Sequence, residues 1–215
     1  MATSPLWRKT LSQWKAQVSM WIRRLHEMML QMCDIFFDFR PVFGELELGH
    51  ELRRFVTDAA AGNRAFLYQM FEVQADHRAA IGVFGRLLTE RDDTEHRGHI
   101  NLKYGGTLPL AEAVRLLALR HRIPETNTLV RIRRLLELGV LQRDEADYLE
   151  NAWAFLTGLL LRQQVRDVRA GRKPGNFVDP KQLTGRELER LREYFRTIND
   201  FRARVKADLT GRLLG

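Results

Sequence analysis

The sequence predicts a mainly α-helical fold, a bundle of six to eight helices with short connections and one small β-hairpin near residues 84–104. Apolar residues recur every three or four positions through most of the chain, as in Trp14, Val18 and Trp21, which places them on one face of a helix. Glycine, proline or asparagine interrupts these stretches, and such residues start or end helices. Two long helical stretches at the C-terminal end, joined by a short connection, are typical of a bundle.

Capping residues mark where the helices are expected to start. The clearest start is a capping box, in which Thr184 and Glu187 stand three residues apart. Further start signals are Ser4-Pro5, Asn63, and Thr126 or Asn127. Together with the apolar periodicity, these signals predict helices at 4–25, 46–60, 63–75, 107–122, 126–137, 144–170 and 184–209.

Two segments fall outside this helical pattern. Phe84–Leu88 and His99–Tyr104 lie in the glycine-rich part of the chain, and a polar turn separates them, so we expect them to pair as the hairpin. Asp34–Arg40 either ends a helix or forms a short extended piece, because Pro41 disfavours the helical conformation at the residue before it.

Composition points to a globular protein of the cytoplasm. The chain has 215 residues and a single cysteine, which cannot form an internal disulfide and fits a reducing compartment. Its N-terminus has no apolar signal core, and no apolar run approaches the roughly 18 residues that a membrane span needs. We expect one domain, residues 26–215, preceded by an N-terminal helical arm, residues 1–25.

The net charge of +8 permits a nucleic-acid, lipid or phosphate partner. Arginine is spread along the whole chain among Asp and Glu, and no platform of aromatic and basic residues accompanies it, so nucleic-acid binding is not favoured. Phosphate-loop, dinucleotide-binding, zinc-protease and nucleophile-elbow motifs are absent from the sequence. Arg91 and His96 have the Arg-x4-His spacing of some helical RNases, and Arg115 and His121 are similarly spaced, but the motif is short and common by chance.

Two clusters combine polar side chains with unusual neighbours. Asp38 and Arg40 alternate with phenylalanines in the run 34–44, so each must either pair within the protein or meet a ligand or partner domain if the aromatic rings are buried. Lys103 precedes two glycines and a helix start, a place where a backbone can approach an anion closely. Residues 175–181 are interpreted as a stiff connector between the long helices.

These segments also carry a family resemblance. The chain resembles the C-terminal domain of bacterial nucleotidyltransferases related to PII uridylyltransferase, whose upstream parts usually hold CBS domains and then the nucleotidyltransferase core. The matching segments span nearly the entire chain and are SPLWRKTL (4–11), IFFDFRPVFG (35–44), LKYGGTLPL with the following AVRLLAL (102–119), TNTLVRI (126–132) and NFVDPKQLT (176–184). The family usually has Asp where this chain has Asn101, which weakens any role of charge at that position.

The resemblance implies a substrate-binding domain without chemistry of its own. The family's catalytic core holds Mg²⁺ on a Gly-Ser turn and an Asp-x-Asp pair, neither of which occurs here, so catalytic residues, metal ligands and cofactors are expected in a separate core, in cis or in trans. Asp38, Arg40, Lys103 and Arg115 are the candidates to face that core or its nucleotide, in a signal-transduction role. The alternatives are a helical RNase or nucleic-acid-binding module, and a dimerisation bundle that docks through tryptophans of the N-terminal arm.

Overall fold

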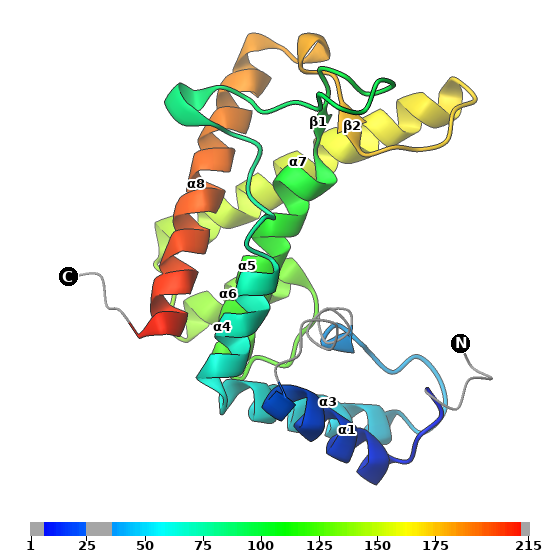
Figure 1. Cartoon of the computed structure of the whole chain (residues 1–215), viewed down its shortest axis with the longest axis vertical. Coiled ribbons are helices and arrows are strands. Elements are labelled where there is room, and N and C mark those ends of the chain that lie inside the picture. Colours follow the sequence, from blue (N-terminus) through cyan, green and yellow to red (C-terminus); the bar gives the residue numbers. More distant parts are fainter. Residues whose placement is uncertain (1–6, 25–35, 212–215) are drawn as a thin grey trace.

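A computed structural model describes residues 7–24 and 36–211 of the chain (Figure 1). Within these ranges the protein has seven α-helices and one two-stranded antiparallel sheet, so the predicted mainly α-helical fold with a small β element is confirmed. The helices are α1 (Leu11–Arg24), α3 (Leu46–Ala61), α4 (Arg64–Val73), α5 (Leu108–Arg120), α6 (Thr128–Glu137), α7 (Arg143–Arg169) and α8 (Gly185–Thr210). The strands are β1 (Ile100–Asn101) and β2 (Phe177–Val178), and the short helical turns are η1 (Val83–Gly85), η2 (Lys103–Thr107) and η3 (Pro180–Gln182).

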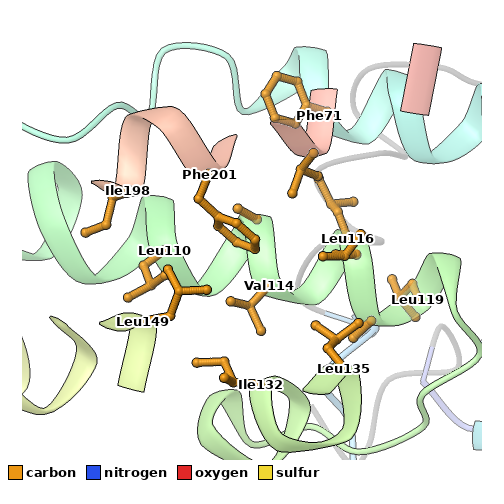
Figure 2. Close-up of a cluster of buried hydrophobic side chains, with 14 of the residues drawn as sticks. Phe71, Leu110, Val114, Leu116, Leu119, Ile132, Leu135, Leu149, Ile198 and Phe201 are labelled. Carbon is orange, nitrogen blue, oxygen red and sulfur yellow. The ribbon is translucent and has the colours of Figure 1, made fainter. Parts of the chain in front are cut away.

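The core is built around α5, which contacts α3, α4, α6 and α8. Ten of its thirteen residues are buried, as expected for a helix that is apolar on nearly all sides. Figure 2 shows the result: Ile198 and Phe201 of α8 lie on one side of Val114, and Ile132 of α6 lies on the other. Leu149 brings α7 into the same cluster, beside Leu110 (Figure 2). The helix α5 is therefore the central helix of the fold, and other helices pack around it.

Most helix starts follow their predicted caps. The side chains of Asn63 and Asn127 each accept a hydrogen bond from a backbone N–H three residues later, and the capping box of Thr184 and Glu187 is present. The first helix differs, because it begins at Leu11, where Thr10 and Gln13 bond reciprocally through side chain and backbone. The predicted start at Ser4-Pro5 lies outside the described residues.

The partner of the first strand is not the predicted one. Ile100 and Asn101 pair with Val178 and Phe177, not with Phe84–Leu88. The glycine-rich segment instead folds on itself, with an isolated bridge between Ile81 and Leu87. Of the extended segment predicted at His99–Tyr104, only Ile100–Asn101 is a strand, because η2 begins at Lys103. Its partner lies more than seventy positions later, beyond the range of hairpin reasoning.

The aromatic residues of α1 pack within the chain. Trp14 lies between Trp7 and Trp21, with ring centroids 6.1 and 6.3 Å away, and Phe36 stacks on Trp14 at 5.0 Å. These contacts, with the packing of α1 on α3, give the tryptophans an intramolecular role. The dimerisation alternative and the division into an arm (1–25) and a domain (26–215) stay predictions. Phe36–Asp38 form a helical turn, while Asp34 and Ile35 lie outside the described residues.

Glu187 is expected to make stability depend on pH in the acid range. Arg162 donates to its carboxylate at 2.7 Å and the Thr184 backbone N–H at 2.8 Å, which lowers the pKa of Glu187 from 4.5 to about 2. A carboxylate with a lowered folded-state pKa stabilises fully above pH 4.5 and loses that contribution as the pH falls toward 2. Urea denaturation of Glu187→Gln should therefore show a shallower loss of unfolding free energy across this window than the wild type. Glu189→Gln, an exposed change on the same helix, is the control, and equal slopes for Glu187→Gln and wild type would contradict the expectation.

Candidate functional site

Asp38 is the point at which three distant segments meet. Its Oδ2 accepts a hydrogen bond from Arg115 Nη1 of α5 at 2.8 Å, and its Oδ1 accepts one from Arg131 Nη2 of α6 at 2.6 Å. The Arg131 side chain is 2% exposed, so its charge is shielded from water and is stabilised by the ion pair with this carboxylate. Charge-assisted bonds of this length are the stronger class of hydrogen bond in proteins. Asp38 thus fastens the turn 36–38 onto the central helix and its neighbour.

A third guanidinium, that of Arg53 in α3, lies in the same cluster. It donates from Nη1 to the carbonyl of Phe37 and from Nε to the carbonyl of Pro124 at 2.6 Å. Arg131 Nε donates to the carbonyl of Glu125 at 2.7 Å, so both side chains also hold the loop before α6. The Nη2 of Arg53 is buried and has no hydrogen-bond partner among the residues that the structure describes.

The cluster gathers charged side chains that are largely shielded from water. Burial, with the nearby charge of Arg131, lowers the pKa of Arg53 to about 10, and burial also lowers the pKa of Arg131. The carboxylates of Asp38 and Glu125 act on both guanidinium groups in the opposite direction. Burying a charged donor costs free energy unless it is paired, so the unpartnered Nη2 of Arg53 favours an added acceptor.

A surface groove of about 550 Å³ opens beside this cluster. One wall is the segment Phe39–Pro41, and the second is α3, through His50, Arg53 and Arg54. The third comprises the loop 124–127 and Val130, at the start of α6. Two sequence motifs that lie about ninety residues apart, 35–44 and 126–132, therefore border one basic groove.

Comparison with known proteins assigns the chain to a family. The family model described as "Putative nucleotidyltransferase substrate binding domain" matches residues 64–209, more than half of the chain. The chain belongs to this family. No curated protein and no solved structure matches it.

The candidate residues of this substrate-binding domain separate into two places. Asp38 and Arg115 are brought together, and Arg40 lines the groove next to them. Of the two outcomes predicted for Asp38, pairing within the protein or contact with a ligand or partner domain, the structure shows pairing, with Arg115 and Arg131. Neither Asp38 nor Arg115 lines the groove, whereas Arg40 lies on its wall.

Lys103 lies apart from the groove, at the other end of the central helix. It is exposed in η2, with its Nζ 5.6 Å from the Tyr104 ring, and twelve residues separate it from Arg115, about 18 Å along a helix. The glycines beside it allow close approach of the chain to itself. A Cβ on Gly105 would lie 2.6 Å from that of Ala80, whose N–H bonds the Gly105 carbonyl. A ligand role for Lys103 stays a prediction.

Arg53 and Arg131 were missed as candidates. Arg131 lies inside the motif 126–132, yet arginine in an amphipathic helix is normally assigned to the exposed face, and only tertiary contact shows that it is buried. Arg53 follows Leu52 and adjoins a second arginine, a pattern that carries no signal of burial. The unusual excess of arginine over lysine was the one available hint, because arginine is the residue used for buried ion pairs.

One member of each RNase-like pair is held in another interaction. His96 bonds Asp93 through Nδ1 at 2.7 Å and stacks on Phe177 at 3.7 Å, in a turn before β1. Arg115 is bound to Asp38, and His121, six residues later, lies about 120° from it around the helix.

The described residues were also compared with the requirements of a metal site and of a membrane-spanning helix. Within residues 7–24 and 36–211, no three His, Cys, Asp or Glu side chains gather in a way that could hold a metal ion. None of the helices in the same part of the chain combines the length and apolar character that crossing a membrane requires.

Proposed function

We propose that this chain binds a substrate in the groove beside Asp38 and presents it to a nucleotidyltransferase core domain that lies elsewhere, in cis or in trans. The family match supports the substrate-binding role. The observation that carries the proposal is the convergence of the motifs 35–44 and 126–132 on one basic groove, with Arg40 on its wall. Arginine presents five N–H donors in a planar fork, which suits phosphate and carboxylate groups.

The chemistry in this proposal belongs to the core. The domain contributes affinity and orientation, and Mg²⁺ on the core would stabilise the transferred phosphoryl group. We further propose that the parent activity is of the PII uridylyltransferase type and serves signal transduction in the cytoplasm of a bacterium. Support for this finer assignment comes from the motif resemblance alone.

Arg40→Gln is expected to weaken nucleotide binding about tenfold. Hydrogen bonds to charged groups contribute about 1.5–3 kcal/mol, and 1.4 kcal/mol corresponds to a factor of ten in Kd. Isothermal titration of the full chain with UTP, ATP and GTP, each with and without Mg²⁺, measures the effect and identifies the preferred base. Arg40 is exposed, so the substitution should leave the fold intact.

Arg91→Gln is the matched control. It removes the same charge from an exposed turn at the end of the molecule that carries β1, away from α3 (Figure 1). Equal loss of affinity in the two variants would show that only the net charge matters. If none of the three nucleotides bound to the wild type, the substrate of this groove would not be a nucleotide.

A further inference from the structure

Asn127 and Val130, at the start of α6, line the groove, and the buried Thr128 lies between them in the sequence. Within the first turn of this helix, the Asn127 side chain accepts the Val130 N–H and the Asn127 carbonyl accepts the Arg131 N–H. Helix geometry leaves the N–H groups of Thr128 and Leu129 without intrahelical acceptors, and the helix dipole adds partial positive charge there. Such an end binds anions well, although the feature is too common to define a site alone.

Arg53 provides the independent observation. Its residue is 6% exposed, it lines the groove, and its Nη2 has no partner among the described residues. A buried charged donor without an acceptor costs free energy, which an incoming acceptor would recover. Nη2 has almost no exposed surface, so binding requires a small shift of the guanidinium or of the segment over it.

The charges around the groove favour an anion. Its one carboxylate, Glu125, lies 3.0 Å from Arg134, which also pairs with Glu137 at 2.7 Å, and Arg54 is paired with Glu47 at 2.6 Å. Arg40 then supplies positive charge at the cavity wall, and the buried Arg53 and the terminus of α6 add positive charge close to it. Phe39, Pro41 and Val130 add apolar surface on the same walls, which a nucleoside could contact while its phosphate meets the donors.

We infer that Arg53 and the N-terminus of α6 form an oxyanion site for the phosphate groups of a nucleotide, at the base of the groove. This inference rests on the proposed function and names the chemical group that is recognised. A phosphate offers several acceptor oxygens, enough to meet Arg53, Arg40 and the free N–H groups of Thr128 and Leu129 together. A neutral nucleoside could occupy the apolar walls but would leave these donors unmatched.

The test is titration of the full chain with sodium pyrophosphate, UTP and uridine at constant ionic strength. Pyrophosphate and UTP should bind and raise the melting temperature, and uridine should bind at least 100-fold more weakly than UTP. Arg53→Lys keeps the positive charge but loses the planar guanidinium with its several N–H donors, and should weaken pyrophosphate binding at least tenfold. Circular dichroism verifies that this variant is folded, since Arg53 also holds two carbonyls.

A second pair of variants avoids Arg53 entirely. Thr128→Pro removes one N–H at the first helical position, where proline is tolerated, and should weaken pyrophosphate binding three- to fivefold. Thr128→Ala loses the same hydroxyl but keeps the N–H, so the difference in pyrophosphate affinity between the proline and alanine variants measures the contribution of the N–H. Equal binding by the proline and alanine variants would overturn the role of the helix terminus.

The outcomes separate this inference from the proposed function. Nucleotide binding without pyrophosphate binding, or pyrophosphate binding unchanged by Arg53→Lys and Thr128→Pro, would overturn the oxyanion site and leave the substrate-binding role standing. Failure of every ligand to bind would count against both. Weakening of pyrophosphate and UTP by the same factor in the two variants would support the site for the phosphate group itself.

Discussion

Asp38→Asn is expected to lower the free energy of unfolding by about 2 kcal/mol, because two nearly buried guanidinium groups lose a charged acceptor. The side chains of Arg115 and Arg131, 8% and 2% exposed, would face an amide in place of a carboxylate. The Asp38 side chain is itself 37% exposed, so water at this position offsets part of the loss. For a chain of this length, the change corresponds to a fall in melting temperature of roughly 4–8 °C.

Thermal denaturation followed by circular dichroism measures this effect. Asp58→Asn is the matched control, since Asp58 is paired with Arg122 at 3.5 Å and both side chains are about two-thirds exposed. Exposed pairs contribute little, so this control should change stability by less than about 1 kcal/mol. Asp38→Asn combined with Arg131→Met should be less destabilising than the sum of the single changes. A melting temperature for Asp38→Asn equal to that of Asp58→Asn would show that the cluster does not hold the fold.

Leu149→Ala is expected to destabilise the protein by about 3 kcal/mol. Leu149 is fully buried on α7 and packs beside Leu110 of the central helix (Figure 2). Truncating a buried leucine costs the lost transfer free energy and a cavity term, together about 2–5 kcal/mol. Chemical denaturation should show a lower midpoint with an unchanged slope.

The same substitution on the same helix provides the control for Leu149. Leu161 lies twelve residues later on α7 and is 62% exposed. Leu161→Ala should change the unfolding free energy by less than about 0.5 kcal/mol. If the two variants were equally stable, α7 would not be part of the cooperative core around α5.

Local signals in the sequence were sufficient to predict where most of the helices lie. Apolar periodicity and caps such as Asn63 and Thr184 act over a few residues, so a single sequence contains nearly all the information needed. The sequence did not predict the pairing of Ile100 with Val178, because tertiary contacts, and not nearby turns, determine which strands pair. The boundaries moved by a few residues where competing caps were available, as at Thr10.

Only part of the candidate site could be predicted from the sequence, again because its contacts are tertiary. Asp38 stood out because a carboxylate among phenylalanines has to be paired, and the prediction that it is paired or ligand-bound needs no knowledge of the partner. Its partners Arg115 and Arg131 lie 77 and 93 residues away, and nothing local distinguishes Arg131 from its exposed neighbours. Arg53 was missed because burial of an arginine is a property of the assembled fold.

The matched family region, residues 64–209, holds only part of the Asp38 cluster. It contains Arg115 and Arg131, but Asp38, which accepts a hydrogen bond from each of them, precedes it. A fragment that begins at residue 64 would therefore keep two nearly buried guanidinium groups and lose a carboxylate that contacts both. The groove is divided in the same way, because Arg40 and Arg53 precede this boundary and Asn127 and Val130 follow it.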